Sequence, residues 1–330
     1  MLKITSAFIT GITGQDGHHL TKLLLEKGYT VHGLIRGQRP EKEREFSIRF
    51  PTVKLHKGDL SDISSLIRIL TKIMPDEIYN LGSMSFVGLS FQQPELTANI
   101  TGLGTLRLLE AVKNTKNLVD NVKIYQASSS EMFGKVQETP QSETTLFYPR
   151  SPYGVAKTFA HYTCVNYREA YSMFISCGIL FNHEGEFRGE EFVTRKITSN
   201  VAKIKTGKIK SFSLGSISPR RDWGYAGDYA HAMWLMNQHS RPDNFVIATG
   251  TSHSVEEFLL KSLEYAGLDD LPEKYVTFDE NLKRPSEVDS LVGDFSKANK
   301  VLGWQPTTSF DDLVRIMINS DLMIQSKQLN

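Results

Sequence analysis

The stretch "SAFITGITGQDG", residues 6–17, decides the fold of this chain. Its apolar beginning, residues 6–10, predicts a buried strand, and Gly11, Gly14 and Gly17 follow directly on that strand and open a helix. The backbone N–H groups of such a loop and the N-terminus of the following helix can receive a pyrophosphate, because glycine permits close approach. A structural tight turn is the alternative, but the flanking strand and helix favour a dinucleotide-binding βαβ unit.

The alternation of strand and helix continues through the first half of the chain. Strands are expected at residues 6–10, 30–35, 52–57, 77–81 and 123–128, and an isolated strand at 245–249. Helical patterns occupy residues 18–28, which end in Gly28, 62–74, which stop before Pro75, and 100–114. This order predicts an α/β fold with a doubly wound, Rossmann-like parallel sheet that binds ligands at the carboxyl ends of its strands.

The alternation of strands and helices becomes less regular from about residue 185, and this predicts two domains. Residues 1–184 form a dinucleotide-binding domain, to which some later segments return. Residues 185–330 are less regular and form a smaller C-terminal α/β lobe that binds the substrate.

The composition excludes several classes of protein. Lys and Arg number 38 against 37 Asp and Glu, so the net charge of +1 gives no field that attracts nucleic acid or an anionic membrane. Cys164 and Cys177 show neither metal-ligand spacing nor a disulfide framework, which fits a reducing cytosol. No apolar run approaches the roughly 20 residues that span a bilayer, and the N-terminus resembles no signal peptide. We expect a soluble cytoplasmic protein without a metal.

The end of the second predicted strand bears on the choice of cofactor. Arg36 stands where a contact to the ribose of NAD would require Asp or Glu, and Arg39 follows. Arginine suits a 2′-phosphate, so NADP is favoured over NAD, the alternative being that Arg36 is a solvated surface charge. Asp59 and Leu60 follow the third strand, where an adenine edge would be held, although Asp59 could equally cap the next helix.

A second motif, "RSPYGVAK" at residues 150–157, predicts the catalytic pair that such a loop requires. Ser151 is a good N-cap and Pro152 suits the first helical position, so Tyr153 and Lys157 lie on one face of the first turns. A free phenol has a pKa near ~10, but an adjacent ammonium and the helix dipole both favour the phenolate. Tyr153 can then take a proton from a sugar hydroxyl while hydride leaves its carbon.

The stretch "QASSSEMFG", residues 126–134, adds a carboxylate to this site. Ser128, Ser129 or Ser130 can supply the hydroxyl that binds the substrate oxygen, but simple alcohol oxidation does not need Glu131. A ketone at C4 of a sugar acidifies the proton on C5, and a nearby carboxylate can pass that proton to the departing C6 hydroxyl. Glu131 therefore predicts loss of water, unless it is only a solvated or helix-capping carboxylate.

With these residues in place, the sequence resembles the GDP-mannose 4,6-dehydratases of the extended short-chain dehydrogenase/reductase group. The resemblance covers nearly the whole chain and is carried by "ITGITGQDG", "YQASSSEMFGKVQETPQ", "FYPRSPYGVAK", "FNHE", "FVTRKIT", "RDWGYAGDY" and "RPSEVD". It implies conversion of GDP-mannose to GDP-4-keto-6-deoxymannose, with catalytic groups at Ser129, Glu131, Tyr153 and Lys157. The position of Ser129 is commonly Thr in the family, so a hydroxyl is kept.

The same resemblance implies two sets of binding residues. The expected NADP contacts are Gly11, Thr13, Gly14, Gln15, Asp16, Gly17, Arg36, Asp59, Leu60, Leu81, Ser83, Ser85, Tyr153, Lys157, His183 and Arg188. The expected contacts to the GDP-sugar are Ser85, Glu131, Asn182, Val193, Lys196, Arg221, Arg284 and Glu287.

Three segments depart from the family pattern. Gly185, Glu186 and Phe187 in "NHEGEFRG" replace Ser, Pro and Arg, and Met84 and Phe86 in "GSMSFVG" replace polar Gln and His. The loop after Arg36 is shorter than the family's insert, which in relatives helps to build a tetramer, so a homodimer is expected, with a homotetramer as the alternative.

Two other functions remain open at this point. The same framework can reduce, epimerise or dehydrate a different nucleotide sugar, such as a GDP-heptose, although reduction needs no base at C5. A cofactor-binding regulatory or scaffold protein is the non-enzymatic alternative, but it would be expected to have lost the Tyr–Lys pair or the hydroxyl.

Overall fold

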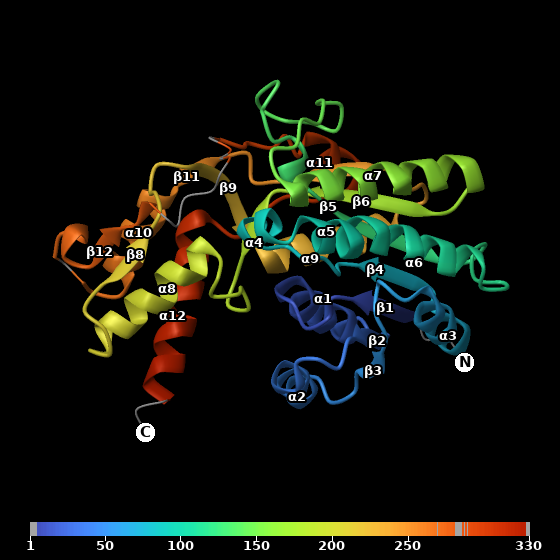
Figure 1. Ribbon diagram of the computed structural model, residues 1–330, viewed down its shortest axis with the longest axis horizontal. Helices are drawn as coiled ribbons and strands as arrows, with labels where there is room; N and C mark the ends of the chain where they lie inside the picture. Colours follow the sequence, from blue (N-terminus) through green and yellow to red (C-terminus); the bar gives the residue numbers. More distant parts are fainter. Residues whose placement is uncertain (1–4, 269, 281–285, 287, 289, 328–330) are drawn as a thin grey trace.

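A computed structural model describes residues 5–268, 270–280, 286, 288 and 290–327 of the chain (Figure 1). Its centre is a seven-stranded parallel sheet in the order β10-β6-β5-β4-β1-β2-β3. The strands are β1 (Ser6–Thr10), β2 (Thr30–Ile35), β3 (Lys54–Lys57), β4 (Glu77–Asn80), β5 (Lys123–Ser129), β6 (Ile175–Leu180) and β10 (Asn244–Ile247). The predicted doubly wound α/β fold is confirmed, and each predicted strand exists within a few residues of its expected bounds.

Helices cover both faces of this sheet because its strands alternate apolar side chains to either side. Ala7 and Ile9 of β1 join one apolar core, whereas Phe8 joins the other. The first face carries α1 (Gln15–Glu26), α2 (Pro40–Arg49), α9 (Ala226–Gln238) and α11 (Ser296–Leu302). The second carries α3 (Ile63–Ile73), α6 (Gly104–Lys113) and α7 (Pro152–Tyr171).

The ends of the helices test the capping residues that the sequence predicts. Ser151 caps α7 by accepting the Gly154 N–H at 3.0 Å, and Gly28 adopts the left-handed region after α1, both as predicted. The alternative role of Asp59 as a helix cap is wrong, because Asp62 caps α3 by accepting from the Ser64 N–H at 3.0 Å. The helix expected at 100–114 is α6, preceded by a π-helical segment η1 (Ala98–Leu103) and the short helices α4 (Val87–Gln92) and α5 (Pro94–Thr97).

The smaller lobe has its own core, formed where α8 (Val193–Lys205) packs against α10 (Val255–Tyr265) and α12 (Phe310–Lys327) (Figure 1). Two small sheets complete it: β11-β9-β7, from β7 (Asn182–Glu184), β9 (Arg220–Tyr225) and β11 (Ser252–Ser254), and β12-β8, from β8 (Phe212–Leu214) and β12 (Val276–Phe278). Among the described residues, no helix is both long and apolar enough to cross a membrane.

Several segments of the second half return to the large sheet. Helix α9 packs on α1, and β10 pairs with β6 at the edge of the sheet. The strand expected at 245–249 is therefore not isolated, and that part of the prediction is wrong. Phe245, Val246 and Ile247 are all fully buried, which is typical of a strand in a parallel sheet covered on both faces.

The order of the strands reverses between β1 and β4, which defines the switch point where ligands bind in such sheets. Polar side chains join the strands there. The Thr10 hydroxyl donates to Asn80 Oδ1 at 2.6 Å, and Asn80 Nδ2 donates to Gln126 Oε1 at 2.7 Å.

Candidate active site

The glycine loop between β1 and α1 requires glycine for close packing. A Cβ on Gly17 would lie 2.1 Å from the carbonyl oxygen of Ile12, so no side chain fits at position 17 in the first turn of α1. Gly11 has a φ of +69°, and a Cβ there would lie 2.9 Å from the backbone nitrogen of Gly82. Gly14 occupies the N-cap of α1 and offers no side-chain cap, so the first N–H groups of the helix face the loop.

The loop after β4 lies against the glycine loop. The Gly82 N–H donates to the hydroxyl of Thr10 at 2.9 Å, and a Cβ on Gly82 would meet Leu60 at 2.8 Å. The structure thus brings together predicted cofactor residues from the ends of three strands. These residues are Gly11 after β1, Leu60 after β3, and Leu81 and Ser83, which flank Gly82 after β4. Thr13 is half-buried in the loop, and Ser85 is exposed.

The expected 2′-phosphate and adenine residues lie at the outer strands. Arg36 follows β2 directly and is exposed, as is Arg39. The Asp59 carboxylate accepts from the Ser61 N–H at 2.8 Å and the Ser61 hydroxyl at 2.7 Å, which forms a local turn.

The four expected catalytic residues converge at the end of β5 and the start of α7. Ser129, the last residue of β5, caps the short helix η2 (Ser130–Met132) by accepting the Glu131 N–H at 3.2 Å. Tyr153 lies in the first turn of α7, and Lys157 lies one turn further. All four side chains are at least nine-tenths buried. Lys157 Nζ lies 5.7 Å from the centre of the Tyr153 ring and donates to the Ala127 carbonyl at 2.7 Å.

The contacts of Ser128 and Ser129 distinguish these two serines. Ser128 Oγ lies 2.8 Å from His161 Nδ1, so its hydroxyl is occupied by a partner on α7. Ser129 contacts both the Glu131 N–H and the phenol of Tyr153. The residue beside the tyrosine is therefore Ser129, in agreement with the resemblance.

Burial governs the acid–base properties of the pair. Burial raises the pKa of Tyr153 well above its usual value, the hydrogen bond from Ser129 opposes this, and the charge of Glu131 adds to it. Burial also lowers the pKa of Lys157, to about 8. The expectation of a lowered phenol pKa is thus wrong for the chain by itself, because desolvation by burial is the largest effect and raises the pKa.

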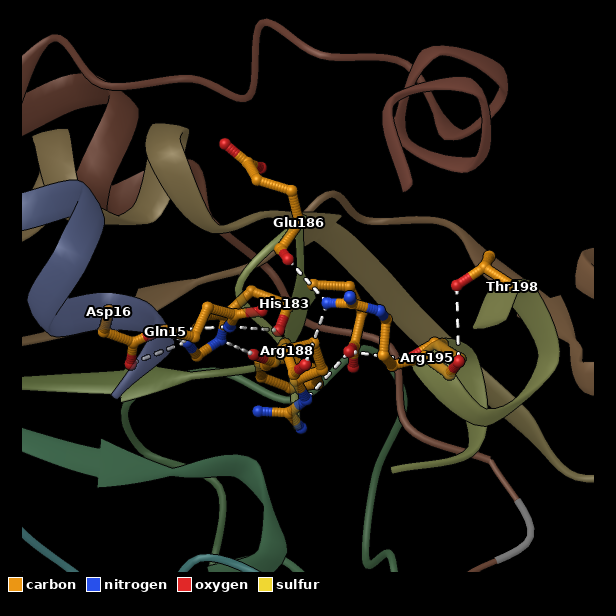
Figure 2. Close-up of polar contacts among 10 residues, drawn as sticks. Gln15, Asp16, His183, Glu186, Arg188, Arg195 and Thr198 are labelled. Carbon is orange, nitrogen blue, oxygen red and sulfur yellow. Dashed lines mark hydrogen bonds and ion pairs between the residues drawn. The ribbon is translucent and has the colours of Figure 1, made fainter. Parts of the chain in front are cut away.

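A partly buried ion pair joins the start of α1 to β7 (Figure 2). His183 Nε2 lies 3.0 Å from both carboxylate oxygens of Asp16, and His183 Nδ1 lies 2.8 Å from the Phe181 carbonyl. Both ring nitrogens face acceptors, an arrangement that favours the doubly protonated ring. Gln15 Nε2 donates to the His183 carbonyl at 3.0 Å and adds a second link.

The pKa values of this pair move apart for the same reason. Burial lowers the pKa of His183, but the Asp16 charge and hydrogen bond outweigh it and the net pKa is raised. Burial raises the pKa of Asp16, but His183 outweighs it and the net pKa is lowered.

Arg188 belongs to the segment 185–189, which departs from the family pattern. Its Nε lies 2.9 Å from Glu184 Oε2, and its guanidinium stacks 3.5 Å above the Phe192 ring. The edge of Phe192 meets Phe86 at 5.7 Å between ring centres. The departures at 82–88 and 185–189 therefore meet around one expected cofactor residue.

The departure at 185–187 has partners on α1. A Cβ on Gly185 would lie 3.1 Å from His19 Nε2, so His19 takes the space that a side chain at 185 would use. Phe187 stacks on His18 at 4.6 Å between ring centres, beneath the Arg49 guanidinium at 4.7 Å. These contacts fix the segment against the large domain.

The expected substrate residues lie on β7, α8 and β9. Asn182 opens β7 and pairs with Trp223 of β9, while Val193 and Lys196 lie in the first turn of α8. Burial lowers the pKa of Lys196. Arg221 on β9 is buried and donates to the Arg220 carbonyl at 2.8 Å. Arg284 and Glu287 lie outside the described residues.

Sequence reasoning missed two buried residues beside this site, Arg195 and Asp321. Arg195 lies inside the quoted motif "FVTRKIT", between two expected substrate residues. Its partner Asp321 stands 126 positions further on, so no local pattern connects them. Among the described residues, no group of three or more His, Cys, Asp and Glu side chains is arranged to hold a metal ion.

The parallel sheet, the glycine loop and the buried Ser129, Tyr153 and Lys157 define an enzyme of the extended short-chain dehydrogenase/reductase class. The fold is shared with the UDP-glucose 4-epimerase of Thermotoga maritima, solved with UDP-glucose, at a TM-score of 0.85 and 23% identity, over 99% of this chain and 100% of that one.

Within this class, the chain belongs to the GDP-mannose 4,6-dehydratase family, whose model, described as "GDP-mannose 4,6 dehydratase", matches residues 8–317. It is 50% identical to GDP-mannose 4,6 dehydratase 1 of Arabidopsis thaliana, over 98% of this chain and 91% of that protein. It is 48% identical to the GDP-mannose 4,6 dehydratase of Homo sapiens, over 98% of this chain and 93% of that protein.

Proposed function

We propose that this chain is a lyase that converts GDP-mannose into GDP-4-keto-6-deoxymannose. Family membership supports the substrate and does not favour another nucleotide sugar, a reductase or an epimerase. The observation that carries the proposal is the buried carboxylate of Glu131 beside Ser129 and Tyr153, because oxidation at C4 alone needs no carboxylate.

The first step is oxidation at C4. Ser129 and Tyr153 hold the C4 hydroxyl, and Tyr153 takes its proton while hydride leaves C4. Because burial raises the pKa of Tyr153 in the chain alone, the phenol would act as base only with positive charge beside it, and Lys157, fixed by the Ala127 carbonyl, would supply part of that charge. When bound, the nicotinamide cofactor accepts this hydride and later returns it.

The second step is loss of water. Glu131 takes the acidified proton from C5 and passes it to the C6 hydroxyl, which leaves as water. The C5–H and C6–O bonds break and a C5–C6 double bond forms. The proton that Tyr153 took from the C4 hydroxyl would go to C5 and the hydride to C6, so the two electrons removed at C4 would end at C6 and no external oxidant is consumed.

The cofactor is proposed to be NADP. The Gly14 N-cap has no side chain, so the first N–H groups of α1 are open to a pyrophosphate. His183 and Arg188 would supply positive charge beside it, and Arg36 and Arg39 would bind the 2′-phosphate. Replacing Arg36 should then weaken NADP far more than NAD.

The GDP-sugar is proposed to lie across β7, α8 and β9. Lys196 and Arg221 would bind its pyrophosphate, Asn182 would hold the sugar, and Val193 would contact the guanosine. Arg284 and Glu287 are proposed to complete the site, and Ser85 to contact the sugar.

A homodimer in the cytoplasm is the proposed form of the protein, with a homotetramer as the alternative. Val155, Phe159 and Tyr162 form an exposed apolar stripe along α7, with 45–56% of each side chain accessible. Leu103 on η1 adds a further exposed apolar side chain. A stripe of this kind is typical of an interface between subunits.

The test is to incubate the purified protein with GDP-mannose and a catalytic amount of NADP, and to follow the mass of the nucleotide sugar. Loss of one water without accumulation of NADPH is the expected result. Loss of water from a different nucleotide sugar only would overturn the substrate, and accumulation of NADPH would overturn the closed redox cycle.

A further inference from the structure

Arg195 on α8 uses its guanidinium to hold main chain on one side and a carboxylate on the other (Figure 2). Its Nη1 donates to the Glu186 carbonyl at 2.5 Å and to the Arg188 carbonyl at 3.2 Å. Its Nε and Nη2 lie 2.9 Å and 2.8 Å from Asp321 Oδ1. Only 8% of Arg195 is exposed, so these partners, rather than water, satisfy its donors.

Asp321 on α12 is held by hydrogen bonds to both of its carboxylate oxygens. It is 1% exposed, and its second oxygen, Oδ2, accepts from the Thr198 hydroxyl at 2.7 Å. A buried charge without its partner is strongly destabilising, so neither side chain can turn away from the other. The C-terminal helix therefore determines where the guanidinium of Arg195 points.

The segment that Arg195 holds connects the two halves of the site. It follows β7, which carries Asn182 and His183, and it precedes α8, which carries Val193 and Lys196. Gly185 and Gly189 flank it and give its main chain little intrinsic rigidity. Figure 2 shows Arg188 on this segment close to His183 and Arg195, while the Glu186 side chain points away from the cluster.

We propose that Arg195 and Asp321 are positioning residues, which hold the main chain of residues 185–188 so that Arg188 and His183 face the ligands. This inference rests on the function proposed above, since it assumes that the cofactor and nucleotide sugar bind along this segment. Neither residue touches a reacting atom. Their removal should weaken binding much more than it slows chemistry.

The alternative is that the pair only ties α8 to α12. A double variant separates the two roles. Arg195→Met with Asp321→Leu removes both charges together, and replacing a buried ion pair with apolar side chains is often neutral for stability. The double variant still lacks the hydrogen bonds from Arg195 to the carbonyls of Glu186 and Arg188.

The experiment compares wild type with this double variant and with Arg195→Lys, which keeps a charge for Asp321 but lacks the planar fork. Thermal unfolding, hydrogen exchange of a peptide spanning residues 185–192, the Kd for NADP, and KM and kcat for GDP-mannose are measured. A matched control is Lys261→Met with Asp311→Leu, which removes another ion pair of α12, at 2.7 Å, on the side of α10.

The expected result is a double variant with near-wild-type Tm, faster exchange at 185–192, and a Kd and KM about tenfold higher with a smaller change in kcat. The control pair should leave exchange and binding unchanged. Wild-type exchange and affinity in a folded double variant would overturn the proposal. If the double variant does not fold, Arg195→Lys decides by the same readouts, and unchanged exchange and affinity there would also overturn it.

The wild-type enzyme separates this proposal from the proposed function. If wild type does not dehydrate GDP-mannose, the proposed function fails, while exchange at 185–192 still reports whether Arg195 holds the segment. If wild type is active and the variants retain its exchange and affinities, only the positioning role fails.

Discussion

The catalytic residues at the end of β5 and the binding segment from β7 to α8 differ in the sequence separation of the hydrogen bonds that hold them in place. At β5, Ser129 accepts from Glu131 two residues away, and Ser151 accepts from Gly154 three residues away. At β7, Gln15 donates to His183 across 168 positions, and Arg195 donates to Asp321 across 126. Short-range contacts shape the turns that carry Ser129 and Tyr153, and Lys157 reaches Ala127 across 30 positions, whereas the binding segment depends on contacts that span 126 and 168 positions. Substitutions should therefore separate chemistry from binding.

The largest effect is expected at the catalytic half. Glu131→Gln keeps the size and burial of the side chain but removes the base for C5, so kcat for dehydration should fall by about 10²–10⁴-fold. The Kd for NADP should stay unchanged. The measurement is single-turnover kinetics with mass detection, with Glu169→Gln on the exposed side of α7 as the control. Full turnover in Glu131→Gln would show that dehydration does not depend on the carboxylate of Glu131.

The next effect tests the local rigidity of the glycine loop. Gly17→Ala places a Cβ 2.1 Å from the Ile12 carbonyl oxygen, which is rigid backbone, so the loop must move. We expect a loss of several kcal/mol of stability and no measurable NADP binding. Gly102→Ala is the control, because its Cβ would meet Phe159 at 3.3 Å and that side chain can shift. Thermal unfolding and cofactor titration check both, and equal tolerance of the two would contradict the steric account.

A pH-dependent effect is expected at the binding half, because Asp16 and His183 link α1 to β7. The raised pKa of His183 gives stability that is complete below its usual 6.5 and is lost as pH rises through the raised value. The lowered pKa of Asp16 gives stability that is complete above its usual 3.8 and is lost as pH falls through the lowered value.

Wild type should therefore exceed His183→Asn in stability most between pH 3.8 and 6.5, and by less at higher pH. Urea unfolding of both proteins across this range provides the check. A difference that grows above pH 7 would mean that the ring is neutral in the folded protein.

The smallest effect concerns the departure at Gly185. Gly185→Ser introduces a Cβ 3.1 Å from His19 Nε2 and should cost about 1 kcal/mol of stability. His19→Ala opens that space, so the double variant should recover part of the loss. A double-mutant cycle of unfolding free energies measures the coupling, and strict additivity would show that the two positions are independent.

The comparison also explains how far the sequence could be read. The order of strands, the cap at Ser151 and the position of Tyr153 one turn before Lys157 follow from patterns within short windows, and the structure agrees with them. The return of β10 to the large sheet, the ion pair of Asp16 with His183 and the grip of Arg195 depend on residues far apart in sequence. The direction of the Tyr153 pKa also depends on burial, which periodicity does not quantify.

The closed redox cycle is the central claim, and one isotope measurement tests it directly. GDP-mannose with deuterium at C4 is incubated with the enzyme and unlabelled NADP, and the nucleotide-sugar product is examined by mass and NMR. The account predicts loss of one water with deuterium retained at C6 of the product. Deuterium that leaves the sugar and accumulates in NADPH or exchanges into the cofactor pool would contradict it.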